Sequence, residues 1–169
     1  MRKFTTLLAA AAFTLTGLSL FAQAKIAVVD TMRVANDCKE GKKIQSVLKA
    51  FHDQKQSEIT AKETALKALE EQAKDPKISE ERKDELRTQF NNKLYEYQAF
   101  AKASQDEMEA KTQKLQGEFQ EKLARVIQSY AEAKGVSLVV EKGICLYNAD
   151  TLEATADIVA AMNQAYPGA

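Results

Sequence analysis

The side chains best suited to chemistry are few in this sequence, and they do not gather. There is a single histidine, His52, and it lies among charged residues. The adjacent acids Glu70 and Glu71, like Glu80 and Glu81, diverge around a helix, so they act as solvated charges rather than as a catalytic dyad. No Cys or His residues have the spacing of a metal site, and no Gly-rich phosphate loop is present. We therefore expect no enzyme activity, no metal and no cofactor.

Two cysteines, Cys38 and Cys145, leave two alternatives open. In an oxidising compartment they could form a disulfide, provided that their Cα atoms come within about 7 Å of each other. Otherwise they are separate thiols that behave as small apolar side chains. The sequence does not decide between the two.

The first 24 residues have the pattern of a secretory signal peptide. Arg2 and Lys3 form a basic start, a mostly apolar run follows at residues 7–21, and "AQA" at residues 22–24 forms a small-x-small cleavage pattern. The alternative, a membrane helix, is disfavoured because the run is short and is interrupted by polar residues and a glycine. We expect an exported, periplasmic protein that begins at Lys25 and has no transmembrane segment.

The charge balance of the exported part argues against one class of partner. Without Arg2 and Lys3, 22 basic residues remain against 24 acidic ones, a net charge of about −2. Proteins that bind nucleic acid usually carry a clear basic excess. No nucleic-acid partner is expected.

The middle of the chain predicts two long helices around one break. Residues 42–74 carry an apolar stripe at steps of three and four, which is thin between residues 51 and 66. Pro76 ends this helix because its ring removes a donor and clashes with the preceding turn. The second helix is expected over residues 80–134. The short break predicts an antiparallel helical hairpin with its tip at residues 75–79.

The second helix contains a repeat of eleven residues. One row recurs at Leu86, Tyr97, Met108, Phe119 and Tyr130, and a second at Phe90, Ala101, Thr112 and Leu123. Eleven residues over three turns are about 3.67 per turn, so the stripe runs almost parallel to the helix axis. The helix is therefore predicted to keep one face against a partner along its whole length.

The two ends of the chain predict a small β-rich base. Strands are expected at residues 25–30, 136–140 and 144–147, a helical turn and a loop at residues 31–41, and a short amphipathic helix at residues 155–164. Three short strands and one helix are marginally stable alone, so we expect the base to self-associate. The candidate residues for this association are Ile26, Val28, Leu138, Val139, Val140, Leu146, Tyr147 and Ile158.

The expected fold class is mainly α with a small β component, as a long antiparallel helical hairpin projecting from the base. If the helices pair about the tip, Lys42 lies opposite about Lys111, and residues beyond about 115 have no partner in the first helix. The arm is therefore assigned to residues 42–114, and the base to residues 25–41 together with 115–169.

Two segments carry a resemblance to a known family: "KIAVVDTMRV" at residues 25–34 and "VSLVVEKGICLYNADTLEATADIV" at residues 136–159. Together with the order of elements, they resemble the Skp (OmpH-like) family of periplasmic chaperones over essentially all of the mature chain. The family's closing segment typically has an apolar strand, an aromatic residue followed by Asn or a small polar residue, and Asp-Ile-Thr before the last helix. Here "YN" at residues 147–148 matches, whereas "EA" at residues 153–154 replaces Asp-Ile, and only Thr155 is kept.

The resemblance implies a trimer with a β-rich hub and three helical arms around a cavity. Members of the family hold unfolded outer-membrane β-barrel proteins without using ATP. Many members have basic arms or tips, whereas residues 62–93 here contain eight basic and eight acidic side chains. A basic cluster that binds lipopolysaccharide therefore cannot be carried over to this chain.

Five aromatic side chains of the arm are candidates for contact with an unfolded client. On a helical wheel, Tyr95 falls nearly opposite the seam and Phe100 on its flank. If these two residues do not contact a client, Tyr95 is an ordinary surface tyrosine and Phe100 packs within the molecule. Phe51, Phe90 and Tyr97 are weaker candidates because seam packing suits them better. The thin stripe of the first helix predicts arms that splay for large clients. The alternative role is a structural coiled-coil spacer or tether of the envelope without unfolded clients.

Overall fold

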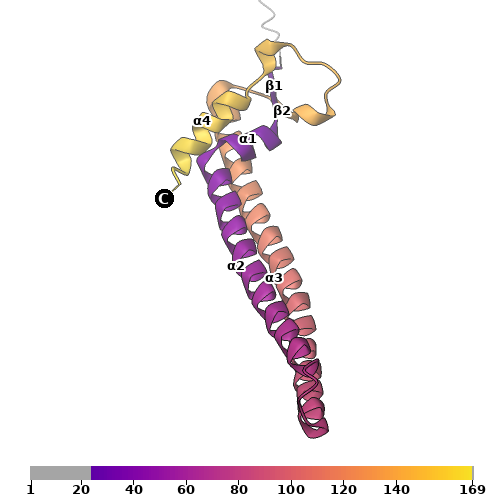
Figure 1. The fold of residues 1–169 in the computed structure, drawn as a ribbon. Helices are drawn as coiled ribbons and strands as arrows, with labels where there is room; N and C mark the ends of the chain where they lie inside the picture. Colours follow the sequence, from indigo (N-terminus) through magenta and orange to yellow (C-terminus); the bar gives the residue numbers. More distant parts are fainter. Residues whose placement is uncertain (1–23, 169) are drawn as a thin grey trace, which may run out of the picture.

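The computed structural model describes residues 24–168 and shows a long helical hairpin that projects from a small base (Figure 1). The elements follow in the order β1, α1, α2, α3, β2, η1, η2 and α4, where η denotes a short 3-10 helix. This architecture confirms the expected fold class. The expected signal peptide lies outside the described residues, apart from Ala24.

Helices α2 (Lys39–Ala73) and α3 (Glu80–Lys134) form the two legs of the arm. Pro76 lies in the short connection between them, as the sequence predicts. Ser79 begins α3 by accepting a backbone hydrogen bond at its Oγ (3.2 Å). Gly135 ends the helix in the left-handed conformation, with φ at 65°. At about 1.5 Å per residue, the 55 residues of α3 span roughly 80 Å.

The eleven-residue rows of α3 lie on its packed face, as the repeat predicts. None of their members is exposed, although most other residues of the helix are. Leu86 and Phe119 are buried. The stripe of α2 is shallower, because Leu66 is its only buried apolar side chain and Val47 is exposed.

The register between α2 and α3 differs from the expected one. Lys122 Nζ pairs with the carboxylate of Glu40, so helix pairing continues past residue 115. The expectation that Lys42 lies opposite about Lys111 is therefore wrong. Side chains tilt toward the N-terminus of their own helix, so the residues that meet in an antiparallel pair have higher combined numbers than a count from the tip suggests.

The segment after the first strand forms a helix, α1 (Thr31–Asp37), rather than the expected single turn and loop. Only Cys38 separates α1 from α2, and its Sγ accepts a hydrogen bond from Gly41 N at 3.3 Å. A Cβ at position 41 would lie 1.8 Å from the carbonyl oxygen of Ala35. Gly41 therefore permits two helices to touch, and it marks no loop.

Strands β1 (Ile26–Val29) and β2 (Leu138–Glu141) form a parallel two-stranded sheet that joins the two ends of the chain. The third strand expected at residues 144–147 is not formed. Its place is taken by η1 (Lys142–Ile144) and an irregular segment. A strand there would have no covering layer in the single chain against which to bury its apolar side chains.

The core of the base is built from segments far apart in the sequence. Helix α4 (Thr155–Ala165) packs against α1, β1 and the end of α3 (Figure 1). It follows η2 (Asp150–Leu152), after which Glu153 forms a single parallel bridge with Val28. One buried cluster comprises Ala27, Val29, Val34, Cys38, Phe119, Leu123, Val126, Ala154, Ile158 and Met162. The core is complete only when both ends of the chain have come together.

Candidate functional site

The side chains best suited to catalysis or metal binding lie far apart from one another. His52 has a side chain that is 63% exposed, with Nδ1 at 3.5 Å from Asp53 Oδ1. Among residues 24–168, no group of three His, Cys, Asp or Glu side chains is placed to hold a metal ion. Within the same range, no helix combines the length and the apolar character needed to cross a bilayer. The surfaces of the arm and of the base remain as candidate sites.

The two cysteines are separate thiols in this structure. Cys38 belongs to the buried core at the junction of α1 and α2. Cys145 lies on the irregular segment after η1, where its Sγ donates to the carbonyl oxygen of Glu141 at 3.5 Å. The disulfide alternative is therefore not formed within the chain, because one thiol is packed inside the base and the other is on its periphery.

The aromatic candidates of the arm lie at different depths. Tyr95 is the most exposed, at 74%. Phe51, Phe90 and Phe100 are partly buried. Tyr97 lies at the seam, where its hydroxyl donates to a glutamate carboxylate of α2 at 2.9 Å, and this hydrogen bond raises the pKa of Tyr97 above its ordinary value. The exposure of Tyr95 agrees with its place on the helical wheel, and the seam position of Tyr97 agrees with the eleven-residue row. The contact of either side chain with a client stays a prediction.

Lysine ammonium groups lie against the rings of Phe51 and Phe100. Lys55 Nζ is 5.3 Å from the centroid of the Phe51 ring and 5.2 Å from that of Phe100. Lys111 Nζ lies 4.8 Å from the Phe51 centroid, and Lys62 Nζ lies 5.0 Å from that of Phe100. Such cation–π contacts engage both rings within the arm. Sequence reasoning missed them because most of them cross between the helices and depend on the register.

The middle of the arm is joined by polar side chains. Lys55, whose side chain is only 16% exposed, forms an ion pair of 2.7 Å with Glu107 on the other helix. Ser104 is the only buried residue of α3 between Leu86 and Phe119. No hydrogen-bond partner for its Oγ exists in the described part of the chain. This stretch has no apolar core comparable with that of the base.

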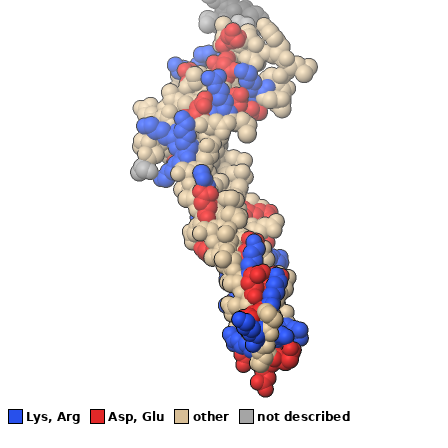
Figure 2. Space-filling view, viewed as in Figure 1, with Lys and Arg blue, Asp and Glu red and all other residues tan. Residues whose placement is uncertain are grey.

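The tip half of the arm carries charges of both signs. Figure 2 shows lysine, arginine, aspartate and glutamate side chains interleaved there, whereas the face in view is mostly uncharged near the middle of the arm. Lys74, for example, pairs with Glu70 and Glu71 at 3.1 and 2.8 Å. An open groove of about 490 Å³ lies between the helices near the tip, with Leu69 and Gln89 among its lining residues. The tip is therefore a balanced surface, as its composition predicts.

The eight side chains predicted for an oligomerisation base fall into three groups. Val28 and Ile158 are buried in the core of their own chain, so they stabilise it from within. Val139 and Val140 are partly buried. The exposed members are Ile26, Leu138, Leu146 and Tyr147.

The exposed apolar residues of the base extend beyond the predicted set. Leu146 and Tyr147 are 107% and 86% exposed, and their neighbour Ile144 is 78% exposed. Met32 of α1 is 71% exposed. Met32 was not among the predicted residues, because a helical turn with a single exposed methionine gives no sequence signal for a contact surface. We call the set of Met32, Leu138, Ile144, Leu146 and Tyr147 the apolar set of the base.

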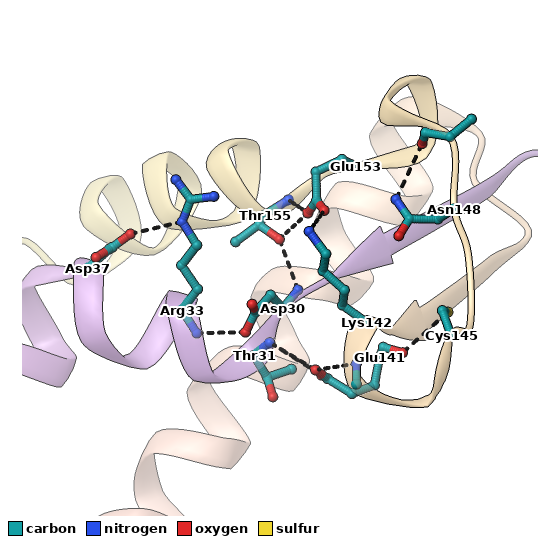
Figure 3. A network of polar contacts seen from close by, with 12 residues as sticks. Asp30, Thr31, Arg33, Asp37, Glu141, Lys142, Cys145, Asn148, Glu153 and Thr155 are labelled. Carbon is teal, nitrogen blue, oxygen red and sulfur yellow. Dashed lines mark hydrogen bonds and ion pairs between the residues drawn. The ribbon is translucent and has the colours of Figure 1, made fainter.

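A polar network fixes β1 against the segment that precedes α4 (Figure 3). Asp30 N donates to Thr155 Oγ1 at 2.8 Å, and Thr155 Oγ1 donates in turn to the carboxylate of Glu153. Lys142 Nζ lies 2.6 Å from the second oxygen of Glu153. The carboxylate of Glu141 accepts the first backbone N–H of α1 at 3.2 Å. The network therefore ties three separate segments together.

The same contacts control the charge of Glu153. Hydrogen bonds from Lys142 and then from Thr155 hold the pKa of Glu153 below its ordinary value of 4.5. The bond to Glu153 likewise raises the pKa of Lys142. Position 153 is where the sequence departs from the expected Asp-Ile-Thr pattern. At position 153 the departure keeps a carboxylate beside Thr155, one methylene longer than that of Asp, whereas Ala154 replaces the Ile of the pattern.

Three contacts hold the root of the arm: one joins its two helices, and two join these helices to the C-terminal segment of the base. Glu40, buried in the first turn of α2, pairs with Lys122 of α3. Asn163 Oδ1 of α4 accepts Lys39 N at 2.7 Å and so caps the start of α2. Lys122 Nζ also lies 5.4 Å from the ring centroid of Tyr166. The arm is thus held firmly where it leaves the base.

The chain is similar to one known family and to a solved structure of the same shape. A family model described as "Outer membrane protein (OmpH-like)" matches residues 25–162. The crystal structure of a candidate outer membrane chaperone (OmpH-like) from Caulobacter crescentus has a TM-score of 0.78 and 20% identity, over 86% of this chain and 88% of that chain. At this identity the likeness shows the fold alone. No curated protein matches the sequence significantly.

Proposed function

The chain belongs to the OmpH-like family, and from that premise we propose that it is an ATP-independent holdase chaperone of the periplasm. It binds unfolded outer-membrane β-barrel proteins between helical arms and prevents their aggregation. The observation that carries the proposal is the shape of the molecule, a long and thinly packed arm on a clamped root (Figure 1).

The surface of the arm suits the chemistry of such clients. An unfolded β-barrel protein exposes alternating apolar side chains and unpaired strand edges, both of which promote aggregation. Helices satisfy their own backbone hydrogen bonds, so the arm offers no edge that a client strand could extend. Tyr95, at 74% exposure, presents an apolar ring with a polar end, which favours weak contacts of no fixed geometry.

The apolar set of the base supports self-association. Exposed apolar patches on soluble proteins usually mark a surface that binds a partner. Leu146 and Tyr147 expose almost all of their apolar surface to water, which is unfavourable in free energy. Their cover is a second and a third copy of the chain, in the trimer that family membership suggests. One arm encloses nothing, whereas three arms from one hub surround a cavity.

The proposal is tested by diluting a urea-unfolded outer-membrane β-barrel protein into buffer with and without the purified mature chain. Light scattering should fall to the baseline at about one oligomer per client, with no nucleotide present. Scattering that is unaffected by a large excess of the chain would favour the alternative role, a structural spacer of the envelope.

Variants separate the two surfaces. Tyr95→Ser combined with Phe100→Ser should weaken suppression of aggregation by several-fold and leave the mass of the oligomer unchanged. Leu146→Asp combined with Tyr147→Asp should shift the sedimentation mass to that of one chain, because two charges would be buried in the contact. A double variant at 146 and 147 that keeps the wild-type mass contradicts the assigned interface.

Export is tested by the sequence of the mature N-terminus. Protein isolated from the periplasm should begin at Lys25, after removal of the expected signal peptide. A periplasmic protein that retained the apolar run at residues 7–21 would contradict this part of the proposal.

A further inference from the structure

The packing of the arm is uneven along its length. Toward the tip, Leu66 and Leu86 are buried, and toward the root, Phe119 and Leu123 are buried. In the long stretch of the described arm between these ends, Ser104 is the single buried side chain. Ile59, which the sequence offers as the large apolar residue of this stretch, is only partly buried and lines an open groove of about 360 Å³. The middle of the arm is therefore not held by apolar burial.

Lys55 takes the place of an apolar core in this stretch. It reaches from α2 to Glu107 of α3 at 2.7 Å, with a side chain that is only 16% exposed. On its way it lies 5.3 and 5.2 Å from the rings of Phe51 and Phe100, one on each helix. A single side chain thus joins both helices and covers both rings. Partial burial strengthens these electrostatic contacts relative to those of a fully solvated lysine.

Ser104 opposes this closure. It is 5% exposed, and no donor or acceptor of the described chain reaches its Oγ. A buried hydroxyl without a partner destabilises the state that buries it, and water would satisfy it as soon as the helices part. Ser104 and Lys55 line the same groove, so the weak point and the ion pair lie in the same part of the seam.

We infer that the middle of the arm is a latch, which Lys55 closes and Ser104 weakens, and whose opening uncovers the rings of Phe51 and Phe100 for apolar segments of an unfolded chain. The role of the two rings rests on the proposed function, whereas the latch itself does not. The tip and the root stay closed when the middle opens, because buried leucines and the Glu40–Lys122 clamp hold them. The two helices then separate only in the middle of the arm and stay paired at both of its ends.

Amide hydrogen exchange of the mature chain tests the latch without any client. Lys55→Met keeps the apolar stem and removes the charge, so exchange over residues 54–62 and 97–108 should become about fivefold to tenfold faster. Glu107→Gln should act in the same direction. The matched control is Lys49→Met, since Lys49 pairs with Asp53 on the same helix and is 76% exposed. It should leave the middle of the arm unchanged.

The serine gives a test of opposite sign. Ser104→Ala removes the unpartnered hydroxyl, and exchange in the middle of the arm should become about fivefold slower. Ser57→Ala is its control, because Ser57 is exposed on α2 and shares only the gain in helix propensity. The inference is overturned if Lys55→Met leaves exchange unchanged, or if Ser104→Ala does no more than Ser57→Ala.

The rings are tested with a client. A photoreactive phenylalanine analogue at position 51 or 100 should crosslink to an unfolded β-barrel protein about twice as well in the Lys55→Met background. An unchanged yield overturns the role assigned to the rings. If the wild-type chain fails to suppress aggregation while exchange behaves as expected, the proposed function falls and the latch stands.

Discussion

Two isoleucines show how differently the base and the arm are stabilised. Ile158 of α4 has no exposed surface and belongs to a core built from both ends of the chain. Ile59 of α2 is only partly buried and lines an open groove between two helices. The base is held by contacts between distant segments, and the arm is held by helices that need little beyond themselves.

This difference assigns separate tasks to the two regions. A base with a buried apolar core resists deformation and keeps the root of the arm in place. An arm with few buried side chains can deform at small cost in free energy, because there is little apolar surface to expose. Under the proposed function, loose packing in the arm is the property that would let a rigid base serve clients of different size.

The largest expected effect breaks the base. Ile158→Ala should lower the free energy of unfolding by about 3 kcal/mol, since a fully buried aliphatic side chain is lost and a cavity remains. Urea unfolding followed by circular dichroism measures it. Ile59→Ala is the matched change in the arm and should lower it by less than about 1 kcal/mol. Equal losses at the two sites would contradict the contrast between the regions.

Two helical glycines give the next largest contrast. Gly41→Ala should destabilise the protein by about 2 kcal/mol, because the new Cβ would lie 1.8 Å from the carbonyl oxygen of Ala35. Gly117→Ala should stabilise α3 by up to about 1 kcal/mol, since a Cβ added at this position would meet nothing within 4 Å. The same urea unfolding experiment measures both, and the two changes in the free energy of unfolding should have opposite signs.

One buried threonine in the base and one exposed threonine in the arm sharpen the comparison further. Thr155→Val leaves Asp30 N without its acceptor in the base and should lower the free energy of unfolding by about 1.5 kcal/mol. Thr64→Val in the arm removes only an exposed bond to the carbonyl oxygen of Thr60, and its effect should stay within about 0.5 kcal/mol. A larger loss at Thr64 would mean that the arm depends on side-chain hydrogen bonds after all.

The smallest expected effect is a dependence on pH that belongs to the base. The folded pKa of Glu153 is below 4.5, so its stabilisation is fully present above that pH and is lost as the pH falls through the lower folded value. Glu153→Gln should flatten this acid limb of the stability curve. Asp53→Asn in the arm should leave it unchanged, because the Asp53–Lys49 pair is largely exposed and screened. Chemical denaturation at several acidic pH values measures the difference.

The regular features of the chain could be predicted from its sequence because they depend on local pattern. The eleven-residue rows predicted the packed face of α3, Pro76 predicted the tip, and Gly135 predicted the end of the helix. The terminal helix and the first two strands also follow from short runs of apolar residues. Each of these signals lies within a single element or turn, so tertiary contacts did not override it.

The features that were mispredicted depend on contacts between segments. Gly41 resembles a loop residue until the closeness of Ala35 is known. A third strand at residues 144–147 has the right composition and no neighbour in the single chain. The cover of Phe51 and Phe100 by lysines follows from the register of two helices, which side-chain tilt shifts away from a simple count.

The parallel pairing of Ile26 with Leu138 has a consequence for the order of folding. The whole arm separates these partners along the chain, so β1 must wait for β2 and α4 to emerge before it finds its place. The hairpin, whose contacts begin beside its own turn, can zip up in the meantime and bring the distant ends together, which shortens the search. A chain halted before residue 138 would therefore carry a nearly finished arm without the α4 contacts that hold its root on the base.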